Sequence, residues 1–67
     1  MNIRVNDEPR TIGQNCTVAG LLAELGFAGR KGFAVAVNDA VVARAAWPAH
    51  ALADGDRILL IQATQGG

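Results

Sequence analysis

The residue pair Gly66 and Gly67 at the C-terminus is the part of the chain whose chemistry is most easily named. Glycine has no β-carbon and a permissive backbone, so a Gly-Gly end can enter a slot too narrow for other residues. Its α-carboxyl is ionised at neutral pH, because its pKa is about 3.5, and it is therefore a poor electrophile. Acyl-adenylation by ATP on a partner enzyme would activate it toward a sulfur or nitrogen nucleophile. The pair indicates a carrier, and an ordinary frayed terminus is the alternative.

The residues just before this pair predict how the carboxylate would be presented. Residues 57–62 form an apolar stretch typical of a strand. Residues 63–67 offer little apolar area and are expected to form a flexible tail. Five extended residues reach roughly 16 Å, far enough to enter the active site of another protein. We therefore expect Gly67 to be the modified residue and Thr64, Gln65 and Gly66 to bind the partner.

Length and composition restrict the remaining possibilities. A chain of 67 residues predicts one domain, 1–67, close to the lower size limit for a core without disulfides or metal. Six basic and six acidic side chains cancel, which argues against a nucleic-acid or membrane surface. No run approaches the ~18 apolar residues of a membrane span. A single cysteine and the absence of a signal-peptide pattern at the N-terminus make the cytoplasm the expected location.

Short alternating or apolar stretches, separated by turn residues, predict five strands. The chain opens with a half-buried strand at residues 1–5. Turn residues at 6–9 then lead into a short returning edge strand at 10–12. The other expected strands lie at residues 33–37, 41–44 and 57–62, with turns at 38–39 and 54–56.

One helix is expected between the second and third strands. Thr17 can act as its N-cap, and Gly26 suits the left-handed position that ends a helix. After the fourth strand the chain must leave the sheet at Pro48, which cannot donate to a ladder, and Trp47 is expected to cover the core. The apolar face of the helix is formed by Val18, Leu21, Leu22 and Leu25.

This element order predicts an α+β fold, in which one helix covers one face of a mixed five-stranded sheet. Ile58 and Leu60 of the strand at 57–62 are expected beneath the helix. The ten residues expected in this core are Ile3, Val5, Val18, Leu21, Leu22, Leu25, Val35, Val37, Ile58 and Leu60. The pleat of the strand then turns Leu59 and Ile61 to the opposite face. An uncovered sheet face carrying leucine and isoleucine predicts a partner-binding surface. A loop covering both side chains is the alternative.

A series of residues along the whole chain matches a known pattern: Asn6-Asp7, Thr17-Val18, Leu21-Leu22, residues 34–38, Val42, Arg44, Trp47, His50, Asp54-Gly55-Asp56, Ile58 and Gly66-Gly67. With this series the chain resembles the ThiS family, the bacterial sulfur carrier proteins of thiazole biosynthesis. The resemblance implies a ubiquitin-like β-grasp fold with a free C-terminal Gly-Gly tail. The element order derived above agrees with that fold.

The resemblance also implies a mechanism in which the protein is a co-substrate and not an enzyme. An adenylating enzyme similar to ubiquitin-activating enzymes would use ATP and magnesium to join AMP to the Gly67 carboxylate. A persulfide donor, such as a cysteine desulfurase, would convert the adenylate into a thiocarboxylate. Thiazole synthase would then accept the sulfur and build the thiazole of thiamine. Two alternatives share the fold and the Gly-Gly end: the sulfur carrier subunit of molybdopterin synthase, and a ubiquitin-like protein modifier.

The other reactive residue types are expected to have structural roles. Cys16 has no histidine or basic residue near it in sequence, which favours a small, half-buried hydrophobe over a nucleophile. His50 with one cysteine cannot build a zinc site of three or four ligands, and the turn at 54–56 has too few oxygen ligands for calcium. No glycine-rich phosphate loop is present, so we expect ATP to bind the partner and this chain to hold no cofactor. The two cations at 30–31 are expected in a solvated turn.

Overall fold

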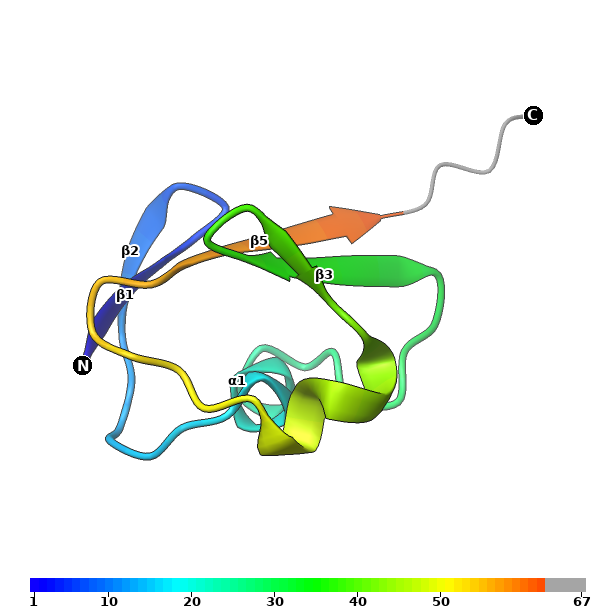
Figure 1. The fold of residues 1–67 in the computed structure, drawn as a ribbon, viewed down its shortest axis with the longest axis horizontal. Helices are drawn as coiled ribbons and strands as arrows, with labels where there is room; N and C mark the ends of the chain where they lie inside the picture. Colours follow the sequence, from blue (N-terminus) through cyan, green and yellow to red (C-terminus); the bar gives the residue numbers. More distant parts are fainter. Residues whose placement is uncertain (63–67) are drawn as a thin grey trace.

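The computed structural model describes residues 1–62; residues 63–67, which include the predicted tail, lie outside the described residues. One mixed sheet has the strand order β2-β1-β5-β3-β4. Helix α1 and the 3-10 helix η1 lie on one side of it (Figure 1). The elements are β1 (Asn2–Val5), β2 (Glu8–Thr11), α1 (Val18–Glu24), β3 (Phe33–Val37), β4 (Ala40–Val42), η1 (Arg44–Ala49) and β5 (Arg57–Gln62). The predicted α+β fold with five strands and one main helix is confirmed.

Strand β5 is last in the chain but central in the sheet. On one side it pairs in parallel with β1, where Arg4 lies opposite Arg57 and Val5 opposite Ile58. On the other side it pairs antiparallel with β3 over residues 58–62. The first and last strands of the chain are therefore neighbours, and β5 lies between the β1–β2 hairpin and the β3–β4 hairpin.

Both hairpins reverse through two residues in the left-handed region, at residues 6–7 and 38–39, with φ between 50° and 71°. Two consecutive positive φ values are typical of type I′ turns, which asparagine and aspartate tolerate better than most residues. The predicted four-residue turn at 6–9 was too long, because β2 already begins at Glu8. Pro9 lies within this edge strand opposite Arg4, a position where a missing N–H is tolerated.

The predicted ends of α1 are confirmed. The Thr17 hydroxyl accepts a hydrogen bond from the Gly20 N–H at 3.1 Å. At the other end Gly26 has φ +82°, and the Phe27 N–H donates to the Leu22 carbonyl at 2.8 Å. This is a Schellman-type end, which satisfies carbonyls of the last turn and folds Phe27 back toward the core.

The segment after β4 differs from the prediction. Strand β4 ends at Val42, and Arg44, which was expected in the strand, begins η1 instead. The 3-10 turns place Trp47 in the core, where its indole N–H donates to the Val42 carbonyl at 2.9 Å. A buried indole N–H needs such a partner. The predicted covering role of Trp47 is therefore confirmed, although the element that carries it was missed.

The core lies between the sheet and the two helices. Eight of the ten residues expected there are buried, while Leu25 and Leu60 are half-buried against the cluster. Four further side chains complete it, and three of them come from the connections and η1. The buried cluster comprises Ile3, Val5, Ile12, Val18, Leu21, Leu22, Val35, Val37, Val42, Trp47, Leu52 and Ile58.

Candidate functional site

Strand β5 connects the core to the end of the chain on which the predicted chemistry depends. Ile58 is fully buried, and Leu60 packs against the core cluster. Leu59 is half-buried and Ile61 is 48% exposed, as expected for residues on the other face of the pleat. The strand ends at Gln62. The predicted modified residue, Gly67, and its neighbours Thr64, Gln65 and Gly66 lie outside the described residues.

The face of the sheet opposite the helices carries a continuous apolar strip. Leu59 pairs with Ala36 and Ile61 pairs with Ala34 across the β3–β5 ladder. Ala36 in turn pairs with Val41 of β4, whose side chain is 71% exposed. Side chains at directly paired positions share one face of a sheet. We call these five residues (Ala34, Ala36, Val41, Leu59 and Ile61) the sheet-face patch; Ala36 is itself buried, and Val41 and Ile61 are the exposed members.

The sequence predicted Leu59 and Ile61 on this face but not Val41. In a short strand at 41–44 the two faces cannot be told apart by alternation, since residues 40–43 are all alanine or valine. The hairpin register decides the question, because it places Val41 opposite Ala36. The two-residue turn that sets this register could have been inferred from the pair Asn38 and Asp39.

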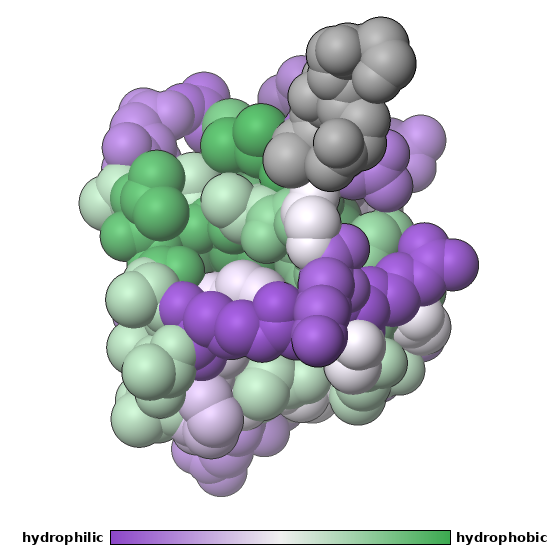
Figure 2. Space-filling model, turned by 90° about the vertical axis from the view of Figure 1, so that its right-hand side faces the viewer, coloured by the Kyte–Doolittle hydropathy of each residue, from purple (hydrophilic) through white to green (hydrophobic). Residues whose placement is uncertain are grey.

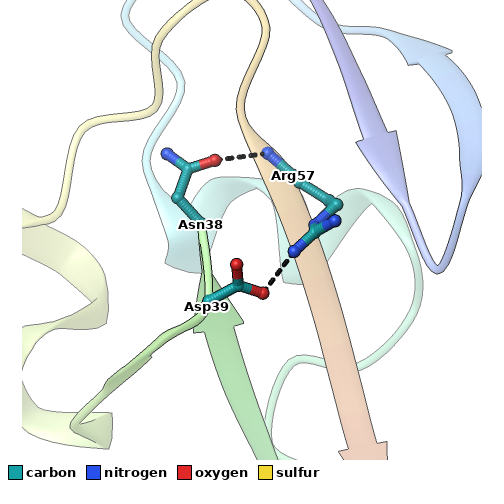
Figure 3. A network of polar contacts seen from close by, with 3 residues as sticks. All are labelled: Asn38, Asp39 and Arg57. Atoms are coloured by element: carbon teal, nitrogen blue, oxygen red, sulfur yellow. Dashed lines mark hydrogen bonds and ion pairs between the residues drawn. The ribbon is translucent and has the colours of Figure 1, made fainter.

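A polar network fixes the start of β5 against the β3–β4 turn (Figure 3). The Asn38 side-chain carbonyl accepts from the Arg57 N–H at 3.0 Å, and its amide donates to the Asp56 carboxylate at 2.9 Å. The Arg57 guanidinium also forms an ion pair with Asp39. Both partners of this pair are exposed, so it contributes at most about 1 kcal/mol. The main effect of the network is therefore to orient Arg57 at the first position of β5.

A second polar contact supports β5 from the β1 side. The ladder between these strands has only two residue pairs, and Asn6 extends it beyond the end of β1. Its N–H donates to the Ile58 carbonyl at 2.9 Å, and its side-chain oxygen accepts from the Leu60 N–H at 2.9 Å. Asn6 thus satisfies backbone groups that the turning strand β1 no longer reaches. As far as Leu60, β5 therefore has hydrogen-bonded neighbours on both sides.

The other candidate residues have structural positions. Cys16 is half-buried, and burial raises the pKa of its thiol, with a smaller contribution from the charge of Glu24. His50 contributes its backbone carbonyl, which accepts from the Val18 N–H at 3.0 Å at the start of α1. Within residues 1–62, no group of three or more His, Cys, Asp or Glu side chains is placed to hold a metal ion. In the same part of the chain, no helix has the length and apolar character needed to cross a membrane.

Comparisons with known proteins agree with this geometry. The model of the ThiS family matches residues 3–67. The chain is 39% identical to the sulfur carrier protein ThiS of Escherichia coli (strain K12) over 67 residues, which cover 100% of both chains. It is also 40% identical over 67 residues to a thiazole synthase of Magnetococcus marinus, of which the match covers only 20%.

Solved structures give the same result. The fold matches the crystal structure of the thiamine biosynthesis protein ThiS from Geobacter metallireducens with a TM-score of 0.85 and 33% identity, covering 100% of both chains. A solution NMR structure of a thiamine biosynthesis protein from the same organism matches with a TM-score of 0.78 and 32% identity, covering 100% of this chain and 88% of that one. Sequence and fold thus agree over the full length, and the chain belongs to the ThiS family.

Proposed function

We propose that this protein is a sulfur carrier of thiamine biosynthesis and that the Gly67 carboxylate carries the sulfur. The observation that supports this most is the match to the sulfur carrier protein ThiS of Escherichia coli, at 39% identity over 100% of both chains. The fold supports it as well. The central strand β5 has hydrogen-bonded neighbours on both sides as far as Leu60, and it ends five residues before Gly67. The folded domain can therefore stay outside a partner's active site while its last residues enter.

The proposed chemistry has three steps, and the catalytic groups of each belong to partner proteins. A carboxylate oxygen of Gly67 attacks the α-phosphorus of ATP on a ubiquitin-activating-like adenylating enzyme, and pyrophosphate leaves. The terminal sulfur of a persulfide, held by a cysteine desulfurase or a similar donor, attacks the acyl carbon and displaces AMP. A thiol then opens the acyl disulfide by thiol–disulfide exchange and releases the thiocarboxylate. The ATP and its magnesium bind to the adenylating enzyme, and the cytoplasm is the proposed location.

The proposed sulfur acceptor is thiazole synthase. The related thiazole synthase of Magnetococcus marinus contains a segment similar to this whole chain, amounting to 20% of its length. A carrier-like segment within the acceptor's own chain supports direct contact between carrier and acceptor. It also favours thiazole synthase over molybdopterin synthase as the acceptor of this protein.

The sheet-face patch is the proposed docking surface for these enzymes. Ile61 and Val41 expose apolar side chains on the face that α1 and η1 leave free. Exposed apolar strips of this kind are typical of interaction sites. The patch ends at Ile61, six residues before Gly67, so an enzyme bound to it would lie within reach of the carboxylate.

Intact-mass spectrometry tests the proposed function. The purified chain is incubated with the adenylating enzyme of its own organism, ATP, magnesium and a persulfide donor. We expect a mass gain equal to the exchange of one oxygen for sulfur, and its loss on adding thiazole synthase with its substrates. Omitting ATP is the control and should abolish the gain. A chain that never gains sulfur in the complete mixture would refute the proposal.

A further inference from the structure

A second apolar surface lies on the other side of the sheet, where the end of α1, the following turn and η1 meet. It is a groove of about 260 Å³, which we call the helical-side groove. Its lining includes the apolar side chains of Leu22, Phe27 and Trp47, and Arg44 is its one charged lining residue. The Phe33 ring joins the two aromatic walls, because its centroid lies 5.4 Å from those of Phe27 and Trp47. Aromatic packing therefore fixes the shape of the groove.

Two guanidinium groups lie over these aromatic rings. Arg44 is 5.1 Å from the centroid of Trp47, and Arg30 is 5.1 Å from that of Phe27. The Arg44 side chain also donates to the Arg30 carbonyl at 2.7 Å, which ties η1 to the turn after α1. Lys31, the residue after Arg30, is a third exposed cation of this turn. Figure 2 shows this end of the molecule, where a band of strongly hydrophilic residues crosses a paler, apolar surface.

Acidic side chains are missing from the segments that carry these cations. Residues 25–38 and 40–53 contain no aspartate and no glutamate. Within residues 1–62 the one ion pair joins Arg57 to Asp39, so no carboxylate there lies within 4.0 Å of the three cations. Cations that form no ion pair with the described carboxylates thus lie beside an apolar groove. The complementary ligand is an anion that also has an apolar part.

We propose that the helical-side groove binds an acidic peptide segment of a partner protein. An apolar side chain of that segment enters the groove, and neighbouring carboxylates face Arg30 and Arg44. Guanidinium groups present a planar fork of donors that matches a carboxylate, and aromatic walls bury an aliphatic side chain well. A small inorganic anion would use the charges and leave the apolar lining empty. From the sequence, residues 30–31 were expected in a solvated turn, because Arg44 and Trp47 lie more than ten positions further along the chain.

This surface is independent of the one proposed for sulfur transfer. The helical-side groove is lined by residues of α1, η1 and the turn after α1, and both helices lie on one side of the sheet (Figure 1), whereas the sheet-face patch is on the other. A protein bound to one of them leaves the other accessible. The partner of the groove can therefore bind while the sheet-face patch is occupied.

Fluorescence of Trp47 tests the proposal, because it is the only tryptophan and it lines the groove. A synthetic hexapeptide of alternating glutamate and leucine, titrated to millimolar concentration, should give a saturable change. The Arg44→Glu variant should bind it roughly tenfold more weakly, since a favourable charge contact becomes a repulsive one. The matched control is Arg4→Glu, the same charge change at an exposed residue on the other side of the sheet. It should leave the affinity unchanged.

Two further titrations separate the apolar and the charged contributions. A glutamate–serine hexapeptide lacks the apolar anchor, and inorganic phosphate supplies charge alone. The proposal is wrong if either binds as tightly as the glutamate–leucine peptide, or if that peptide gives no change at millimolar concentration. Circular dichroism checks the fold of Arg44→Glu, and Arg44→Gln, which keeps an N–H donor, should show a smaller but measurable loss. No enzyme, ATP or sulfur donor is present, so a failure here leaves the sulfur-carrier proposal untouched.

Discussion

Cys16 is the only thiol of the chain, and its surroundings oppose ionisation. Burial, and to a smaller extent Glu24, raise its pKa above the ordinary value of 9.0. The protonated thiol is therefore favoured in the folded state. Its contribution to the free energy of unfolding is present below the pKa of the thiol in the unfolded chain, and it is lost as pH rises through the pKa of the thiol in the folded protein. We predict that iodoacetamide alkylates Cys16 more slowly in the native protein than in denaturant at every pH between 7 and about 9. Glu24→Gln should accelerate the native reaction slightly, and equal native and denatured rates would contradict this assignment.

Gly26 illustrates a residue whose role is set by the backbone alone. Its φ is +82°, and a β-carbon added there would meet no heavy atom within 4 Å. Gly26→Ala should therefore cost about 1–2 kcal/mol, the energy of holding an L-residue in the left-handed region. Gly13→Ala is the matched control, because that site is equally open and lacks a positive φ; it should change stability by less than about 0.5 kcal/mol. Urea unfolding of both variants measures the difference, and equal losses would show that the Schellman-type end is not the cause.

At the scale of elements, the sequence predicts those helices and strands that have a local hydrophobic pattern. The period-two alternation of β1, the apolar run of β5, and the i, i+3, i+4 spacing of α1 predict elements that the structure confirms. The 3-10 helix η1 was missed, because six residues with three alanines have no hydrophobic period. The parallel pairing of β1 with β5 joins residues more than fifty positions apart, and local patterns cannot encode such a contact. The helical-side groove was missed for the same reason, since three separate segments build it.

The alternation along β5 leads to a prediction that separates folding from binding. Ile58 is fully buried, so Ile58→Ala should cost about 2–5 kcal/mol of stability. Leu59 lies on the other face and is half-buried, so Leu59→Ser should cost much less and should weaken association with the adenylating enzyme. Urea unfolding measures the first quantity, and titration calorimetry with the purified enzyme measures the second. If Leu59→Ser destabilises the fold as much as Ile58→Ala, the sheet-face patch is part of the folding core and not a docking surface.

In the molecule as a whole, the core and the two proposed binding surfaces are formed by different residues. The core between sheet and helices supplies stability, and its fully buried members lie between Ile3 and Ile58. The sheet-face patch and the helical-side groove offer two surfaces on opposite sides. β5 belongs to the core at Ile58 and to the sheet-face patch at Ile61. A single strand therefore connects the core to the residues that follow Gln62. Its pairing with β1 on one side and β3 on the other holds it in place.

The last prediction concerns the length of the chain beyond β5. Deleting Gly67 moves the terminal carboxylate back by one residue, and appending an alanine moves it forward and adds a β-carbon. Both variants should fold like the parent, because the fully buried core ends at Ile58. With the adenylating enzyme, ATP and a persulfide donor, the native end should gain sulfur much faster than either variant, because adenylation needs the carboxylate at one fixed distance from the docked domain. The effect should be largest for the deletion, since a tolerant slot would still accept a methyl group. Intact mass after fixed times gives the rates, and a deleted chain that accepts sulfur as fast as the native one would show that Gly67 is not the carrier residue.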